Sequence, residues 1–321
     1  MSAMSFMCGA LLVAALPVVI ASTIAPAPAR ADPLISIKWG KTVVGSGKTV
    51  EVVRPLPAFD QVEARDGIRV VLREAATQKV TIKADDNIEP LIETTVENNT
   101  LMVKPRSKTS MRTQNTMIVM IDYVQLKSLA VNDGVSADLD AAKGALFSAR
   151  VRDGSSLKIA NVSANDMELK VRDGASATIE KVSGARAHTY TVADAGNLKV
   201  FALSGGQVSA VVSDGAKISV SGVALRLLDI KVSDGASANA QGSAQQQNFR
   251  VSDGASADME GLSGQTARAF ATDGSSLKIG KVQTLDVDVS DGSTVRYGGE
   301  PVLTQNVRDG GRLKRLKALR M

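Results

Sequence analysis

An Asp-Gly pair returns at an almost constant interval through most of this chain of 321 residues, and this repeat limits the folds that the chain can adopt. Ten copies follow one another at steps of 18 to 21 residues, and Gly comes directly after Asp in nine of them. The repeated residues are Asp133, Asp153, Asp173, Asp194, Asp214, Asp234, Asp253, Asp273, Asp291 and Asp309. A fixed period of about 20 residues is typical of a solenoid, in which each repeat contacts only its neighbours.

The residues around each Asp predict strands with one buried face. Val stands two positions before Asp in nine copies, and Ala271 takes this place in the tenth. Further apolar residues come four and six positions after Asp, as in Leu157 and Ile159. Apolar residues at every second position indicate a half-buried strand, and Asp-Gly supplies turn residues that accept a positive φ.

Two arrangements would suit such turns. An Asp-Gly pair between alternating strands favours a hairpin and an antiparallel sheet. The constant period favours parallel strands instead, because equivalent residues of successive coils then stack about 4.8 Å apart and Val lies on Val. We therefore predict an all-β fold, a single-stranded parallel β-helix or solenoid with about ten coils of roughly 20 residues. We expect a right-handed coil from the general chirality of parallel connections.

The segments outside the repeat have distinct compositions. We predict a signal peptide over 1–31, a linker with room for one strand over 32–58, N-terminal β coils and a cap over 59–128, the Asp-Gly solenoid over 129–310, and a basic tail over 311–321. Leu313, Leu316 and Leu319 stand at a helix-like spacing among basic residues. The tail is predicted to lie on an anionic membrane or glycan surface, or to form a last coil or a short helix that covers the open end of the core.

The N-terminal segment predicts export. An apolar run from Ala10 to Ile20 precedes Ala29-Arg30-Ala31, an A-x-A cleavage site, so the mature chain is expected to begin at Asp32. No Lys or Arg precedes the run, and a retained N-terminal anchor is the alternative. The only cysteine, Cys8, lies in this segment. We predict a periplasmic or extracellular protein of a bacterial envelope, without a membrane span in its mature form.

The formal net charge of +5 does not indicate a nucleic-acid partner. Once Arg30 and the five basic residues after Asp309 are set aside, 32 basic residues face 33 acidic ones. Aromatic residues make up only 3% of the chain. A nearly neutral body with few aromatic side chains lacks the basic stripe and the stacking platform that nucleic acids require.

Several segments together resemble a known family, the putative auto-transporter adhesin head GIN domain. They are the opening Phe59-Asp60-Gln61-Val62, the strand Gly67-Ile68-Arg69-Val70, the turn Asp85-Asp86-Asn87-Ile88, Leu101-Met102-Val103, the stacked Gly-Ala-Ser coils and the closing Tyr297-Gly298-Gly299-Glu300-Pro301. The resemblance covers roughly 59–310 and implies a β-solenoid envelope domain without an established activity. This chain departs from the family pattern by placing Asp where Ser is common before the turn glycine.

We predict no catalytic residue. The mature chain has one histidine, His188, which we expect to face solvent between two strands and to be incidental. Solenoid lyases and hydrolases act through carboxylates, but here the carboxylates are spread over every coil, which is the pattern of a structural repeat.

The Asp column carries one sharper hypothesis. Carboxylates stacked about 5 Å apart repel one another by on the order of one kcal/mol per pair, so some contact must offset this. In one interpretation each Asp accepts hydrogen bonds from the backbone of its own turn, helped by the Ser that stands three residues later in six copies and by Arg152, Arg172 and Arg308. In the other, Asp153, Asp173, Asp214, Asp234 and Asp253 bind calcium as a ladder. We favour the first and predict no metal and no cofactor.

Three functions remain open from the sequence. The first is a non-catalytic, exported envelope module that binds a polymer, a surface or a protein partner along its stacked faces. The second is a carbohydrate-active enzyme of the lyase or hydrolase type, and the third is a structural or sensory envelope component. We favour the first and expect no enzymatic activity.

Overall fold

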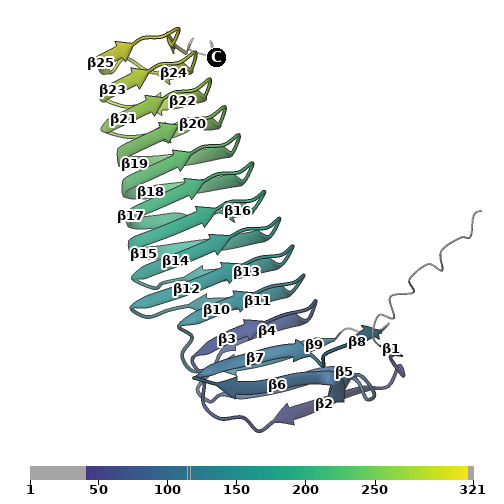
Figure 1. Cartoon of the computed structure of the whole chain (residues 1–321). Helices are drawn as coiled ribbons and strands as arrows, with labels where there is room; N and C mark the ends of the chain where they lie inside the picture. The colour runs from purple at the N-terminus through teal and green to yellow at the C-terminus, as the bar shows by residue number, and fades with distance from the viewer. Residues whose placement is uncertain (1–40, 114, 116, 317–321) are drawn as a thin grey trace, which may run out of the picture. The chain divides into compact units, whose positions relative to one another are not determined.

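The structure is a computed structural model that describes residues 41–113, 115 and 117–316. It is all-β, with 66% of residues in strands and 1% in helix, and parallel coils stack into a β-solenoid of about nine turns (Figure 1). The predicted fold class is confirmed. The predicted signal peptide, 1–31, lies outside the described residues. Within the described ranges no helix is long and apolar enough to cross a membrane.

The strands that precede an Asp-Gly turn form one parallel sheet, which we call the leading sheet. Each strand pairs in register with its counterpart in the next coil, so that Val151 lies beside Val171 and Val171 beside Val192. Along the axis the leading sheet contains β3 (Gln61–Ala64), β10 (Ser128–Val131), β12 (Leu146–Val151), β14 (Asp166–Val171), the second half of β15 (Ser176–Val192), β17 (Leu203–Val212), the second halves of β18 (Lys217–Val232) and β19 (Ser237–Val251), β21 (Thr266–Ala271), β23 (Thr284–Val289) and β25 (Val302–Val307).

The strands that follow the turns form a second parallel sheet, the trailing sheet, on the other side of the core. β15, β18 and β19 are long enough to run from the trailing sheet of one coil into the leading sheet of the next. The trailing sheet contains β4 (Arg69–Glu74), β11 (Ser136–Ala142), β13 (Ser156–Val162), the first half of β15, β16 (Asn197–Val200), the first halves of β18 and β19, β20 (Ser256–Ser263), β22 (Ser276–Lys281), β24 (Thr294–Gly298) and β26 (Arg312–Arg315).

The core lies between these two sheets and consists of stacked columns. The Val column two positions before Asp is buried from Val131 to Val289, and the apolar columns four and six positions after Asp are buried as predicted up to Val295, while Tyr297 and Leu313 at the C-terminal end are partly buried. At this end Val307 is 42% exposed, because among the described strands β25 pairs only with β23. A further buried column of small residues, which the sequence analysis did not predict, packs under the turns two positions after Asp and includes Ala175 and Ala216.

The turns have a conformation that explains their residues. Asp153 and Gly154 both have positive φ, 53° and 67°, and the Ser155 amide donates to the Arg152 carbonyl at 3.0 Å, which is the pattern of a type I′ turn. The Gly154 amide donates to the carbonyl of Asp173 in the next coil at 3.0 Å. The turns therefore add a column of hydrogen bonds between coils.

The one copy without Asp-Gly keeps the same turn. Ala195 occupies the glycine position with φ of 57°, and its amide donates to the Asp214 carbonyl at 3.0 Å. The glycine comes one position later because a Cβ on Gly196 would lie 2.6 Å from the Val171 carbonyl oxygen. Close approach between coils, rather than a positive φ, thus requires Gly196.

The first coil, β3 and β4, lies between a cap and the rest of the solenoid. β7 pairs in parallel with β3, and β9 with β4, whereas β2, β5 and β6 pair antiparallel with their neighbours. The cap contains β1 (Lys41–Val44), β2 (Thr49–Arg54), β5 (Lys79–Asp85), the short 3-10 helix η1 (Glu89–Leu91), β6 (Ile92–Glu97), β7 (Thr100–Pro105), β8 (Thr109–Arg112) and β9 (Ile118–Tyr123). The chain thus begins the cap with β1 and β2, forms the first coil, completes the cap with β5 to β9 and returns to the solenoid at β10.

One segment prediction needs correction. The segment 32–58 is not a linker throughout, because β2 pairs with β5 and β1 pairs with β8 inside the cap. In the tail, Arg312–Arg315 forms strand β26 beside β24, which is the last coil that was one of the expected forms, because β24 offers a strand edge to which this segment can hydrogen-bond. Residues 317–321 lie outside the described part of the chain.

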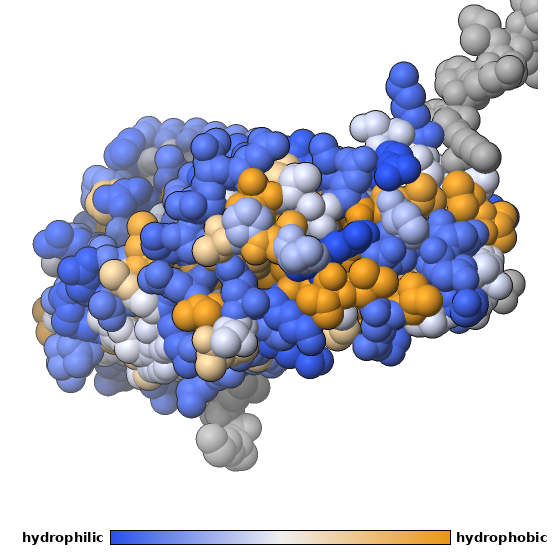
Figure 2. Space-filling model, turned by 90° about the horizontal axis from the view of Figure 1, so that it is seen from below, coloured by the Kyte–Doolittle hydropathy of each residue, from blue (hydrophilic) through white to orange (hydrophobic). Residues whose placement is uncertain are grey.

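The cap end of the molecule carries apolar surface between polar side chains (Figure 2). Val44 and Val53, on β1 and β2, are among the exposed large apolar residues of this end. Single exposed valines are ordinary on protein surfaces, and they do not by themselves define a binding site.

Candidate binding face

The Asp column stands at one edge of the solenoid, where its side chains are exposed on successive turns. Hydroxyl groups donate to several of the carboxylates: Ser213 Oγ to Asp214 Oδ2 at 2.6 Å, and Ser290 Oγ and Thr272 Oγ1 to Asp291 Oδ2 at 2.6 and 2.8 Å. These hydrogen bonds from Ser290 and Thr272 hold the pKa of Asp291 below its usual value. The donors stand one residue before an Asp, not three residues after it.

The capping hypothesis is therefore wrong about backbone and Ser donors, whereas Arg308, which it also named, donates to Asp309 Oδ2 at 3.2 Å. In the described ranges no backbone N–H donates to a carboxylate of these ten turns, because amides such as that of Gly154 donate to the carbonyl of the next Asp instead. Asp suits the position because, with Asn, it is the non-glycine residue that best tolerates the left-handed conformation. The described residues contain no group of three or more His, Cys, Asp or Glu side chains placed to hold a metal ion.

Replacing carboxylates of the Asp column by amides should separate the capping hypothesis from the calcium-ladder hypothesis. We expect Asp214→Asn and Asp234→Asn, singly and together, to leave the free energy of unfolding unchanged or to raise it by up to about 1 kcal/mol, because Asn accepts the same φ and like-charge repulsion is removed. Thermal unfolding with calcium, with magnesium and with a chelator provides the measurement. A rise in Tm of many degrees with calcium alone, lost in the double variant, would instead establish a calcium ladder.

His188 is not at the surface, contrary to the sequence prediction. It lies inside β15, is 1% exposed, and occupies the same inward column as Met167 and Val208. Its Nε2 is 3.2 Å from the Ala164 carbonyl oxygen, and its Nδ1 is 3.3 Å from the Tyr190 hydroxyl. A neutral ring that donates from Nε2 and accepts at Nδ1 satisfies both contacts. His188 is therefore a hydrogen-bonded core residue and not a solvent-facing one.

This burial predicts a specific pH dependence. Burial lowers the pKa of His188, so the unfolded chain takes up a proton before the folded one does. The contribution of neutral His188 to the free energy of unfolding should therefore be fully present above the pKa of histidine in the unfolded chain, about 6.5. It should be lost progressively as the pH falls from there toward the lower pKa of His188 in the folded protein. Urea unfolding at pH 7.5, 6.5 and 5.5 would show this loss. His188→Met, which copies Met167, should remove it, and an equal loss in that variant would assign the effect to other groups.

At the junction of cap and solenoid, Glu74, Tyr123 and Lys143 line a hollow of about 380 Å³, and a second carboxylate, Asp140, contacts two of them. Glu74 pairs with Lys143 at 2.6 Å, and Asp140 accepts a hydrogen bond from the Tyr123 hydroxyl at 2.7 Å and from the Glu74 amide at 2.8 Å. Burial and the neighbouring Asp140 raise the pKa of Tyr123 above its usual value, so the phenol keeps its proton. The Tyr123–Asp140 contact joins the cap to a coil, and the two contacts of Glu74 join the first coil to the next.

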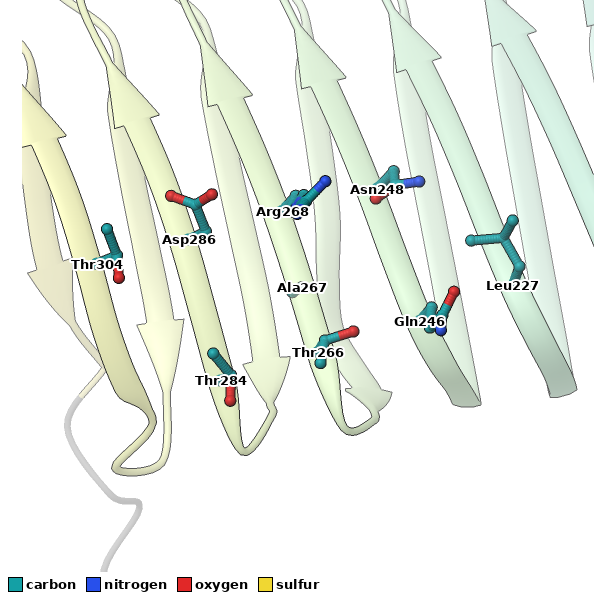
Figure 3. A pocket seen from close by; sticks show the side chains of 9 residues that line it. All are labelled: Leu227, Gln246, Asn248, Thr266, Ala267, Arg268, Thr284, Asp286 and Thr304. Carbon is teal, nitrogen blue, oxygen red and sulfur yellow. The ribbon is translucent and has the colours of Figure 1, made fainter.

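The outer face of the leading sheet contains a larger hollow, of about 530 Å³, that crosses the neighbouring strands β18, β19, β21, β23 and β25 (Figure 3). We call it the outer trough. Its walls are formed by side chains five and seven positions before Asp, which point away from the core because Val two positions before Asp points into it. The residues that line it are Leu227, Gln246, Asn248, Thr266, Ala267, Arg268, Thr284, Asp286 and Thr304.

The trough residues form two columns in register. Gln246 lies beside Thr266 and Thr266 beside Thr284 in one, and Asn248, Arg268, Asp286 and Thr304 follow one another in the other. Figure 3 shows these side chains standing on consecutive strands. With a strand spacing of about 4.8 Å, the trough extends ~19 Å along the solenoid. It thus presents amide, hydroxyl and charged groups at regular intervals.

An exposed aromatic ring stands on the same face. Phe270 is 44% exposed and follows Arg268 by two positions on β21, so both side chains point outward. The Arg250 guanidinium lies over its ring, 5.5 Å from the centroid. Neither the trough nor Phe270 was predicted from the sequence. The sequence does place both features at outward positions, because Phe270 stands three residues before an Asp and the trough side chains stand five and seven residues before one.

Comparisons with known proteins place the chain in a family. A family model described as putative auto-transporter adhesin, head GIN domain, matches residues 58–301. A search of curated proteins gives no significant match. Among solved structures, a putative lipid binding protein from Parabacteroides distasonis is 14% identical, with 86% of this chain and 100% of that chain covered and a TM-score of 0.45. A putative adhesin from Parabacteroides merdae is 17% identical, with 86% and 99% covered and a TM-score of 0.45.

A putative adhesin from Bacteroides fragilis is 13% identical, with 85% of this chain and 100% of that chain covered and a TM-score of 0.30. The family match covers most of the chain, including the cap strands from β5 to β9 and nearly all of the coils. It also begins one residue before Phe59 and ends at Pro301, the limits of the segments on which the sequence resemblance was based. The chain therefore belongs to the family of putative auto-transporter adhesin head GIN domains.

Proposed function

We propose that this protein is a non-catalytic adhesion module, exported to the cell envelope, that binds an extended partner along the outer face of its leading sheet. The observation that carries the proposal is the outer trough, whose polar side chains are repeated in register over neighbouring coils. A long partner can contact equivalent groups on each coil, and many weak contacts then add up. Membership of an adhesin family is consistent with this use of the fold.

The arrangement of the carboxylates supports a binding role over hydrolysis. Hydrolysis of a glycosidic bond uses two carboxyl groups that flank the bond across a cleft. Glu74 is instead paired with Lys143, and Asp140 accepts a hydrogen bond from Tyr123. The aspartates of the Asp column lie at the turns and do not line the trough. The regular exposure of one carboxylate per turn follows from the backbone conformation of the turn rather than from a reaction.

Binding of the whole mature protein to envelope material from its host tests the proposal. Cosedimentation with insoluble envelope fractions should be strong for the parent protein and lost when Thr266→Arg and Thr284→Arg place large side chains in the trough. Thr294→Arg, the same change on the trailing sheet, is the matched control and should still bind. Equal binding by the trough variant and the control would remove the trough from the function.

Two further measurements complete this test. Cell fractionation with N-terminal sequencing should find the protein outside the cytoplasm, beginning near Asp32. Incubation with envelope polysaccharide should release no reducing or unsaturated ends. Steady release of such ends that survives repurification would favour the carbohydrate-active alternative.

A further inference from the structure

We propose that the occupant of the outer trough is an uncharged polysaccharide chain that lies along the solenoid axis, with Phe270 as the platform on which one sugar ring stacks. This inference rests on the proposed function and specifies the chemical class of its partner. Three properties of the face lead to it: its charge balance, its repeat distance and its one exposed aromatic ring.

Most of the charges on this face are balanced by a neighbour of opposite sign, and Lys231, in register beside Arg250, adds one ammonium. Inside the trough, Arg268 and Asp286 stand in register on adjacent strands. Around the trough, Arg250 Nη1 lies 3.9 Å from Asp229 Oδ2, and Arg308 Nη2 lies 3.7 Å from Asp288 Oδ1. A polyanion would meet one unfavourable carboxylate for each favourable guanidinium, and a polycation would meet the reverse. The face therefore complements a partner without net charge.

The uncharged groups of the trough are those that bind hydroxyls. Gln246 and Asn248 each offer an amide donor and an amide acceptor, and Thr266, Thr284 and Thr304 offer hydroxyls that can do both. These groups recur about every 4.8 Å along the axis. A polysaccharide presents hydroxyls of both kinds on every ring, at a repeat close to this spacing, so successive rings can meet successive coils. An extended peptide would instead require a free sheet edge or side-chain pockets.

Phe270 provides the apolar contact that such a partner needs. Sugar rings have C–H faces that pack on aromatic faces, and a half-exposed ring beside a polar trough is placed for this contact. The guanidinium of Arg250 restrains the orientation of the ring from one side. The described residues contain another half-exposed phenylalanine, Phe201, at the bend between β16 and β17, whereas Phe270 stands on β21, two positions after Arg268 of the trough.

Separated fractions of the host envelope identify the partner class. Envelope material is digested with protease to give a polysaccharide pool, which anion exchange divides into a neutral and an acidic fraction, and undigested envelope protein is kept as a third. Calorimetry or affinity electrophoresis with the whole mature protein should show binding to the neutral fraction, with little change between 50 and 500 mM NaCl. Phe270→Ala should weaken this binding about tenfold, and Arg268→Ala by a similar factor.

Matched variants keep the test specific. Phe201→Ala removes an equally exposed ring, and Arg296→Ala removes an exposed guanidinium from the trailing sheet, so both should bind as the parent does. Binding confined to the acidic fraction, with steep salt dependence, or confined to the protein fraction, would overturn the inference. Unchanged affinity of Phe270→Ala would overturn it as well.

The two proposals fail in different ways. If Thr266→Arg and Thr284→Arg abolish binding to whole envelope but the neutral fraction does not bind, the trough is the site and its partner is not a neutral polysaccharide. If those variants bind whole envelope as well as Thr294→Arg does, the trough is not the site, and the proposed function fails first. A folded state shared by all variants, shown by circular dichroism, is required before either comparison.

Discussion

Replacing Val232 by Asp is expected to destabilise the protein by about 4 kcal/mol or more, because the change puts an unpaired charge into a dry column of stacked valines. Val232 is fully buried, and in register it lies between Val212 and Val251 of the neighbouring coils. The new carboxylate would have no donor to contact from either neighbour. Urea unfolding followed by circular dichroism gives the change in the free energy of unfolding.

The adjacent residue provides the control for this change. Lys231 precedes Val232 on the same strand and is exposed, so Lys231→Asp introduces the same side chain on the outer face. Its neighbour in register is Arg250, which can pair with a carboxylate there. We expect a change within about 0.5 kcal/mol. Similar losses for Val232→Asp and Lys231→Asp would contradict the inward and outward assignment of the strand.

Truncation of Phe249 should cost about 3–5 kcal/mol, the usual range for a buried Phe changed to Ala. Phe249 is among the largest fully buried side chains and lies in register between Ile230 and Ala269. Because Ala269 is small, it cannot fill the space that the missing ring leaves. Continuous sheets on both sides of the core also limit how far the coils can collapse into this cavity.

Phe270→Ala is the matched control, since this ring stands on the outer face of β21 and is 44% exposed. It should lose less than about 1 kcal/mol, the size of a cation–π contact with Arg250 at an exposed site. The same comparison shows that Phe270→Ala is folded, which the binding experiments require. A loss for Phe270→Ala as large as that for Phe249→Ala would mean that the outer ring is part of the folding core.

The repeat made the solenoid predictable. Val in nine of the ten copies and Asp-Gly at a nearly constant interval indicate both the strand period and the coil period, and a parallel stack is the arrangement that satisfies both at once. The side-chain period of 2 then assigned inward and outward positions, which the burial of Val171 and Ile159 confirms. Family membership followed from short segments such as Tyr297-Gly298-Gly299.

Other features depended on contacts that no local pattern encodes. The donors to the Asp carboxylates come from neighbouring hydroxyls such as Ser213, because the left-handed turn directs its backbone amides to the next coil. His188 is buried because one polar ring can be satisfied inside the core by the Ala164 carbonyl and by Tyr190. A lone histidine in a strand has no periodic signal that separates this outcome from exposure.

The amino-acid sequence by itself determined the coil, its turns and its core columns, because in a solenoid the neighbour of each residue is its own counterpart one period away. Only the tertiary structure decided what the non-repeating residues do. Cap strands β5 to β9 are inserted between the first coil and its successor in sequence, and β1 and β2 precede the first coil, so the cap pairings join segments that no constant interval relates. The outer trough likewise depends on which outward side chains differ from coil to coil, and on whether those differences leave a hollow once the strands are in register.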